Sequence, residues 1–419
     1  MESPSPLGRA FDVPARTMSP DEIAWPLRLL LILLGYATVV VPAAFVVVYI
    51  RRNSDYFENR SKSLWARWLR LFAVGNPGYE LLVEENTQKR KEDRLENKFW
   101  HDLFLLLFFF SGIQTTLVMM GFLQERIITL GYPLQSDPDK VDKFGDAQFL
   151  IFCNRLVALV FSVFVLSINW KRQPPHVPPL YVHSYTSFSN TLSSWCQYEA
   201  LKYVSFPTQT ICKASKVVVT MLMGRVVRGQ KYSWFEYGCG TMIACGASLF
   251  LLSSSSHSSA MISTSFSGLL LMIGYLLFDA FTLNWQKALF DTRPRVSKYQ
   301  MMFGVNAFSG ILCLVSLVEQ KTLWSSLAFV SLHLGVAQDI FLLSFAGAAG
   351  QLFIYATIEK FGPIVFAVIM TIRQMLSIML SAIYYKHEMS VVALLGFIIV
   401  FASIFVDIQK KYFDKRISK

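Results

Sequence analysis

Charged side chains are scarce in this chain. Aspartate, glutamate, lysine and arginine together make up 16% of the 419 residues, whereas hydrophobic residues make up 53%. So little charge excludes both a disordered chain and an ordinary soluble domain. The net charge of +11 would indicate nucleic-acid binding in a soluble protein. Here the basic residues lie between long apolar segments, so we expect the partner to be the lipid bilayer and not nucleic acid.

Signatures of catalysis and of metal binding are also missing. The six cysteines fall in apolar segments and form no CxxC pair, and the six histidines occur singly, without an HExxH motif. The sequence has no glycine-rich phosphate loop and no nucleophile elbow either. We therefore expect no enzyme activity, no metal site and no cofactor.

What the chain has instead is a series of apolar segments that can each cross a bilayer. They predict an all-α polytopic membrane protein with spans near 27–50, 100–124, 147–169, 185–205, 207–227, 233–255, 263–288, 299–318, 337–358, 362–385 and 389–408. The first begins too late and runs too long for a cleaved signal peptide, so we interpret it as an anchor helix. The predicted divisions are a polar tail (1–26), the anchor (27–50), a charged linker (51–99), two five-helix repeats (100–255 and 256–408) and a basic tail (409–419).

The loops differ in basic charge from one face of the membrane to the other. Loops on the face that includes the linker and the C-terminal tail hold 26 lysines and arginines, and those on the opposite face hold 8. Because basic loops stay in the cytosol, we predict that the C-terminus is cytosolic and that the N-terminus faces a lumen or the exterior.

The ten spans after residue 100 form two sets of five. Because five is odd, the second set starts from the opposite face, which predicts a ten-helix core of two inverted repeats, as in secondary transporters. The fourth span of each set begins with a proline, Pro207 or Pro363, at a position where a missing N–H costs a helix nothing. Lys216 and Arg373 follow these prolines by nine and ten residues. Both cations therefore lie ~13–15 Å deep, near the midplane of a core ~30 Å thick.

A cation at that depth costs at least ~2.5–3.5 kcal/mol and normally marks a substrate path. Lys213 and Lys216 lie with Gln209 and Thr220 at offsets of three and four residues, which predicts one polar stripe along a helix. For Lys213 the alternative is that its ammonium group reaches the nearer membrane surface. The full set of predicted substrate-binding residues is Lys213, Lys216, Arg373, Gln209, Thr220, Gln374, Ser377, Arg155 and Asp279.

The polar candidates also have structural interpretations. Arg155 either contacts the substrate or forms an ion pair with Glu199 or Asp279. Glu199 and Lys202 are three residues apart, which favours a local ion pair over a gate. The hydroxyl and amide candidates, together with Asp279, either bind the substrate or tie helices together.

Several stretches resemble the drug/metabolite transporter superfamily, and within it the nucleotide-sugar and nucleotide-sulfate carriers. The superfamily likeness covers about residues 100–408 and rests on GFLQER at 121–126, FDAFTLNWQ at 278–286, GQLFIY at 350–355 and TIRQ at 371–374. Within that family, FPTQT at 206–210, KASK at 213–216 and MLMG at 221–224 look most like transporters of 3′-phosphoadenosine 5′-phosphosulfate (PAPS). The chain departs from them at Val219, where the resemblance leads us to expect a proline.

The resemblance implies import of PAPS into the Golgi lumen in exchange for an adenosine nucleotide, either adenosine 3′,5′-bisphosphate (PAP) or AMP. It implies a supply of sulfate donor for sulfotransferases, and it is compatible with a homodimer. A UDP-sugar carrier of the same fold is the nearest alternative. A membrane scaffold without transport activity is a more distant one.

Overall fold

The computed structural model describes residues 20–53, 64–75, 98–129, 131–133, 141–169, 173–174, 176–204, 206–254, 265–292, 295–333, 335–384 and 390–417. The helices in this part of the chain are α1 (Pro20–Arg52), α3 (Leu64–Ala73), α5 (Lys98–Thr129), α6 (Ala147–Ile168), α7 (Val182–Ala200), α8 (Phe206–Ala214), α9 (Lys216–Arg228), α10 (Trp234–Ser254), α11 (Phe266–Asp291), α12 (Lys298–Glu319), α13 (Leu323–Leu332), α14 (Val336–Phe361), α15 (Pro363–Tyr384) and α16 (Val391–Ile417). Strands β1 (Gly131–Pro133) and β2 (Val141–Lys143) form an antiparallel hairpin.

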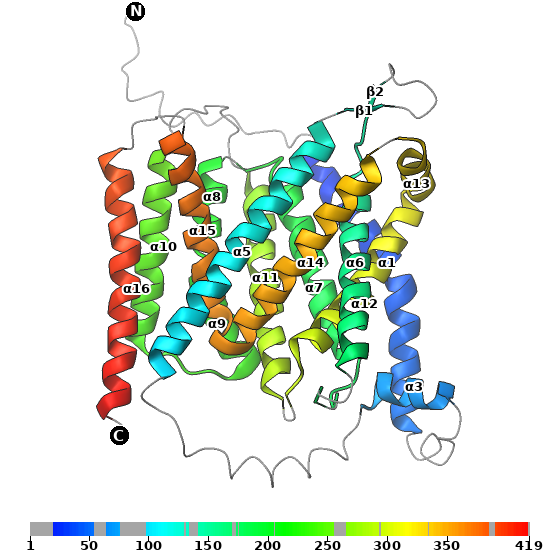
Figure 1. Ribbon diagram of the computed structural model, residues 1–419, viewed down its shortest axis with the longest axis horizontal. Helices are drawn as coiled ribbons and strands as arrows, with labels where there is room; N and C mark the ends of the chain where they lie inside the picture. Colours follow the sequence, from blue (N-terminus) through cyan, green and yellow to red (C-terminus); the bar gives the residue numbers. More distant parts are fainter. Residues whose placement is uncertain are drawn as a thin grey trace, which may run out of the picture.

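The long helices run side by side as one bundle (Figure 1). Among the described residues, nine helices are long and apolar enough to cross a membrane, namely α1, α5, α6, α10, α11, α12, α14, α15 and α16. Helix α7 and the α8–α9 pair run along the same axis between them (Figure 1). Helix α7 needs little apolar surface because its serines and threonines are buried against α11 and α12. The predicted all-α polytopic architecture is confirmed, and nine of the eleven predicted spans coincide with a helix long and apolar enough to cross a membrane among the described residues.

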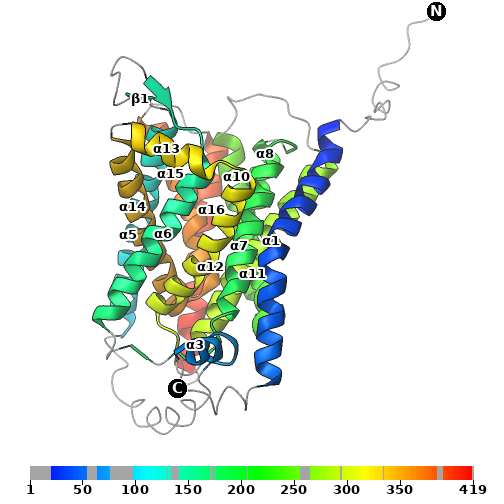
Figure 2. The same cartoon turned by 90° about the vertical axis from the view of Figure 1, so that its right-hand side faces the viewer.

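We name the two sides of the bundle after the chain ends. Helix α1 begins at the N-terminal face, and α16 ends at the opposite C-terminal face (Figures 1 and 2). Helix α13 and the β1–β2 hairpin lie at the N-terminal face, and α3 lies at the C-terminal face (Figure 1). The hydropathy pattern misses these three elements because each is too short to cross a bilayer. The sequence has an Asn-x-Ser sequon at 59–61, in the linker predicted to be cytosolic, and this sequon lies outside the described residues.

The packing of one set of five helices recurs in the other. Helix α5 packs against α14 as α11 packs against α7, and α6 packs against α14 as α12 packs against α7. Helices α10 and α16 lie together at the side of the bundle opposite α1 (Figure 1). They approach closely at Gly246 and Gly396, because a β-carbon on either glycine would lie within 2.9 Å of the other's carbonyl oxygen. These matched pairs support the inverted repeat, which itself stays a prediction.

The structure corrects one predicted span. The sequence predicts a single helix over 207–227, but the helix is interrupted at Ser215 and continues as α9. The Ser215 hydroxyl donates to the carbonyl oxygen of Cys212 at 2.7 Å, and a serine bonded in this way competes with the helical backbone and bends it. The interruption separates Lys213 from Lys216.

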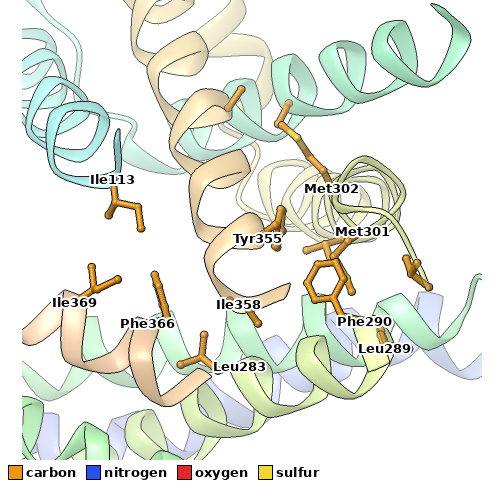
Figure 3. Packing of buried hydrophobic residues seen from close by; sticks show 14 residues of the cluster. Ile113, Leu283, Leu289, Phe290, Met301, Met302, Tyr355, Ile358, Phe366 and Ile369 are labelled. Carbon is orange, nitrogen blue, oxygen red and sulfur yellow. The ribbon is translucent and has the colours of Figure 1, made fainter. Parts of the chain in front are cut away.

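A large apolar cluster fills the C-terminal half of the bundle (Figure 3). Helix α11 contributes Phe290, α12 contributes Met301, and α14 contributes Ile358, each at most 1% exposed. Phe366 and Ile369 of α15 join the same cluster (Figure 3). Through Phe366 and Ile369, this packing positions the residues that follow on α15.

Candidate functional site

Three of the predicted cations meet in the middle of the bundle. Lys213 lies in the last turn of α8, Lys216 begins α9, and Arg373 is at the midpoint of α15. Both Lys213 and Arg373 are electrostatic neighbours of Lys216. The Lys216 ammonium group also lies 5.9 Å from the centroid of the Phe366 ring on α15. The fourth helices of the two predicted repeats therefore approach each other at their charged residues.

Asp279 of α11 provides a counter-charge for this cluster. Its carboxylate lies 2.7 Å from the Lys216 ammonium group, and both side chains are mostly buried. Tyr275, one turn earlier on α11, is an electrostatic neighbour of both groups. The predicted alternative in which Asp279 pairs with Arg155 is therefore wrong. The unliganded cluster carries a net charge of about +2 and not +3, because one of its cations is already paired.

Arg373 has no such counter-charge among the described residues. Its Nε atom is buried and has no hydrogen-bond partner among the described residues. An unpaired buried donor of this kind is costly, so it is normally satisfied by water or a ligand. Gln374 beside it is half-buried, and Ser377, one turn further along the same face, is exposed.

The two remaining candidates from the fourth span are buried. Gln209 is 7% exposed. Thr220 is fully buried, and its hydroxyl donates to the carbonyl of Lys216 at 2.7 Å. The carbonyl of Thr220 accepts a hydrogen bond from Asn284 at 2.9 Å. The backbone of Thr220 thus ties α9 to α11, whereas its hydroxyl bonds within α9.

Sequence reasoning missed Asn284 as the centre of this tie. Its amide nitrogen donates to the carbonyls of Thr220 and Ala280, both at 2.9 Å, and its oxygen accepts from Arg228 at 3.2 Å. Gly224 allows the approach, because a β-carbon there would lie 3.0 Å from the Asn284 oxygen. An asparagine among apolar residues near the predicted Asp279 face was the available signal.

A second polar tie closes the C-terminal end of the same helices. Lys287 of α11 donates to the carbonyl of Glu359 near the end of α14 at 2.8 Å, and it pairs with Asp291 at the same distance. With the Asn284 contacts and the apolar cluster, this joins α9, α11 and α14 in the C-terminal half. The bundle is closed on that side of the cation cluster.

A polar cavity of about 550 Å³ opens in the N-terminal half. Helices α5, α6, α7, α12 and α14 line it, together with Ile32 and Tyr36 of α1. Its polar lining residues include Gln124, Gln148, Asn154, Arg155, Asn190, Thr191, Ser194, Ser316 and Gln320. Arg155 is the one member of the predicted site that lines this cavity, so the structure does not place Arg155 with the three central cations.

Arg155 lies at a hydrogen-bonded junction of three helices. It donates to Asn306 of α12 at 3.5 Å, and Asn306 donates to Gln351 of α14 at 2.8 Å. The predicted pairing of Arg155 with Glu199 is wrong, because Glu199 pairs with Lys202 at 2.7 Å and with Arg28 at 3.3 Å. The predicted local pair between Glu199 and Lys202 is confirmed.

Comparison with known proteins agrees with a transporter. Residues 105–411 match the model of the UAA transporter family. The chain is 68% identical over 411 residues to "Adenosine 3'-phospho 5'-phosphosulfate transporter 1" of Caenorhabditis elegans, covering 97% of this chain and 96% of the relative. It is 42% identical over 405 residues to the protein of the same name in Homo sapiens, covering 97% and 92%. It is 38% identical over 315 residues to "UDP-galactose/UDP-glucose transporter 5B" of Arabidopsis thaliana, covering 74% and 88%. The family match spans well over half of the chain, and the chain therefore belongs to the UAA transporter family, a family of membrane transporters.

Proposed function

We propose that this protein is an antiporter that moves PAPS from the cytosol into the Golgi lumen in exchange for an adenosine nucleotide, PAP or AMP. The observation that carries the proposal is the cluster of Lys213, Lys216 and Arg373 in the middle of the bundle. The relatives named as PAPS transporters align over 97% of the chain, which supports the same substrate. The charge count of the loops supports a cytosolic C-terminal face.

The chemistry of the substrate fits a cluster of cations. PAPS carries a 3′-phosphomonoester, which adds about −1.5 to −2 charges at pH 7, beyond its bridging phosphate and its sulfate. Arginine can hold a phosphate through two parallel N–H bonds, whereas lysine acts as a mobile point charge. The Nε of Arg373, which has no partner among the described residues, is available at once. The charged neighbours of Lys213 are Lys216 and Arg373, so its own charge is available as well. Lys216 becomes available when the anion displaces the Asp279 carboxylate.

Exchange follows from the net charge of the cluster. Without a nucleotide, a net charge of about +2 would have to pass through a closed apolar region as the protein changes from one open state to the other, which is unfavourable. A bound polyanion neutralises the cluster, so the loaded protein reorients readily. PAPS entering on one side and an adenosine nucleotide returning from the other satisfy this condition without ATP.

The described arrangement corresponds to the lumen-open state in this proposal. The ties of Asn284 and Lys287 join α9, α11 and α14 on the C-terminal side of the cation cluster. The N-terminal half contains the polar cavity, whose lining includes Arg155 but none of the three central cations. Alternating access then requires these ties to open while the opposite half closes.

The direct test is uptake of sulfur-labelled PAPS by proteoliposomes that contain the purified protein. We expect uptake only when the vesicles are preloaded with PAP or AMP, and we expect both nucleotides to compete from outside. For substitutions in the cation cluster, Arg225→Gln is the matched control, because Arg225 is an exposed arginine on α9 outside the cluster. Equal uptake into empty and preloaded vesicles would contradict exchange.

A UDP-sugar carrier is the second candidate, because the plant UDP-galactose/UDP-glucose transporter is 38% identical to this chain. Its alignment covers 74% of the chain, whereas the two PAPS relatives named above each cover 97%. The same vesicles distinguish the two substrates. Displacement of labelled PAPS by UDP-galactose, but not by PAP, would overturn the PAPS proposal in favour of this one.

A further inference from the structure

Helix α3 lies across the bundle axis at the C-terminal face, beside the end of α1 (Figures 1 and 2). One side of it is packed: Ala73 is fully buried, and Leu69 and Phe72 contact the end of α1 and Tyr181. On the other side, Trp65 and Trp68 are 79% and 58% exposed. Two tryptophans, one turn apart, are thus held away from the protein interior.

The position of α3 is fixed by backbone contacts. The amides of Leu180 and Tyr181, just before α7, donate to the carbonyls of Leu71 and Phe72, both at 3.3 Å. The chain leaves α3 through Gly75, which has a φ of +78°. A β-carbon at Gly75 would lie 2.1 Å from the carbonyl oxygen of Val177, so only glycine fits this turn. Helix α3 is therefore a fixed part of the C-terminal face.

The surface around the two tryptophans is basic. Arg51 and Arg52 form the last turn of α1, Arg67 lies on α3, and all three are exposed. No acidic residue occurs in 44–53 or in 64–75. The Arg51 guanidinium also lies 5.4 Å from the centroid of the Tyr181 ring, which holds it beside α3.

We propose that the α3 surface, formed by Trp65, Trp68, Arg51, Arg52 and Arg67, binds the headgroup of an anionic phospholipid in the leaflet at the C-terminal face. Tryptophan favours the boundary between the headgroups and the acyl chains. Arginine binds phosphate through paired N–H bonds, and basic residues next to a membrane helix attract anionic lipids. The orientation of α3 across the axis, level with the end of α1, places both groups at that boundary (Figure 1).

This surface lies outside the part of the chain that matches the family, residues 105–411. Its contacts reach into that part, because Phe72 also packs against Phe308 of α12, with the ring centroids 6.2 Å apart. Helix α3 is therefore in contact with the residues just before α7 and with the middle of α12. The inference does not depend on which nucleotide the protein carries.

The first test measures lipid binding by native mass spectrometry of the purified full-length protein, with phosphatidylserine and phosphatidylcholine as probes. We expect the wild type to retain phosphatidylserine at least about fivefold more than the triple variant Arg51→Gln, Arg52→Gln, Arg67→Gln does. Retention of phosphatidylcholine should be the same in both. The control is Arg225→Gln, a lone exposed arginine of α9 near the same face. Equal retention of phosphatidylserine in all three proteins would overturn the proposal, and a melting curve verifies that the triple variant is folded.

The second test locates the tryptophans. In bilayers that contain brominated phosphatidylcholine, the lipid quenches tryptophan fluorescence. We expect this quenched component to be smaller in the double variant Trp65→Phe, Trp68→Phe than in the wild type. If the lost fluorescence is instead quenched by aqueous iodide, the two side chains face water and the proposal is wrong. Neither measurement uses transport, so its failure is distinguishable from failure of the proposed antiport.

Discussion

The fourth helices of the two predicted repeats have the same design but different surroundings. Both begin near a proline, Pro207 or Pro363, and both carry a cation near their midpoint. The first is interrupted into α8 and α9, and its Lys216 is paired with Asp279. The second, α15, is continuous, and the Nε of its Arg373 has no partner among the described residues. Lys216 is thus paired within the protein, whereas the Nε of Arg373 has no hydrogen-bond partner among the described residues.

The neighbours of these two helices differ in the same way. Helix α9 packs along α11, to which Asn284 and the ion pair of Asp279 tie it. Under the repeat, α15 should pack along α5 in the same manner, but that contact is slight over their described residues. Helices α9 and α11 pack closely where they end, in the C-terminal half of the bundle. Helices α5 and α15 end in the N-terminal half and are in only slight contact. Exchanging these two environments would be the alternating-access step.

Replacing Arg373 or Lys216 by glutamine should have the largest effect. Loss of one charge–phosphate contact in a buried site costs about 2–5 kcal/mol, so we expect PAPS exchange to fall at least ~30-fold, close to background. The measurement is uptake by preloaded proteoliposomes at matched protein amounts. Exchange at wild-type rates in either variant would mean that the central cations do not contact the passenger, and the proposed function would have to be abandoned.

Stability should separate the two substitutions. Lys216→Gln leaves the mostly buried Asp279 carboxylate without its partner, so we expect a loss of about 2–3 kcal/mol, smaller than the ~3–5 kcal/mol for a fully buried pair. Arg373→Gln removes a side chain whose Nε is unpaired and should cost less than ~1 kcal/mol. Thermal unfolding in detergent measures both.

The double variant Lys216→Gln, Asp279→Asn is the matched control for that prediction. It removes both charges, so most of the lost stability should return while transport stays low. If Asp279→Asn fails to restore stability, the ion pair is not what distinguishes α9 from α15.

Much of this comparison could be predicted from the sequence. Hydropathy located the nine helices that are long and apolar enough to cross a membrane among the described residues, because a bilayer imposes the length and polarity of every span. The depth of Lys216 and Arg373 followed from counting residues after a proline. The encounter of the three central cations followed from the odd number of helices in each repeat. These conclusions depend on regular geometry, which the sequence pattern encodes directly.

The partners of the charges could not be predicted in this way. The sequence left more than one possible partner open for Arg155, Glu199 and Asp279. Which ion pairs form depends on the rotation of each helix about its axis, which the hydropathy pattern does not give. The break at Ser215 depends on one side-chain hydrogen bond to Cys212, which leaves no trace in hydropathy. Short elements such as α3 are likewise invisible to a pattern that detects only segments of membrane-spanning length.

Asn284→Ala should loosen the closed half by a moderate amount. It removes hydrogen bonds to Thr220 and Arg228, and a tie of this kind contributes about 1–1.5 kcal/mol. We therefore expect amide hydrogen exchange in α9 to accelerate about tenfold, while that in α15 changes little. Ser248→Ala is a suitable control, because the Ser248 hydroxyl bonds to the carbonyl of Ala244 within α10. Equal acceleration in α9 and α15 would contradict the view that α9 alone is tied to α11.

Ser215→Ala should have the smallest effect and would test whether the interruption of the first helix matters. Without the hydroxyl that occupies the Cys212 carbonyl, the backbone is free to form a continuous helix, as in α15. That change is within about 0.5–1 kcal/mol, so we expect a two- to fivefold change in the apparent affinity for PAPS with little change in melting temperature. Ser403→Ala provides the comparison, because the Ser403 hydroxyl makes a similar bond to Ile399 in the uninterrupted α16. If both substitutions leave the affinity unchanged, the break is a local feature of the backbone, and the difference between the two fourth helices rests on the pairing of Lys216 and Asp279.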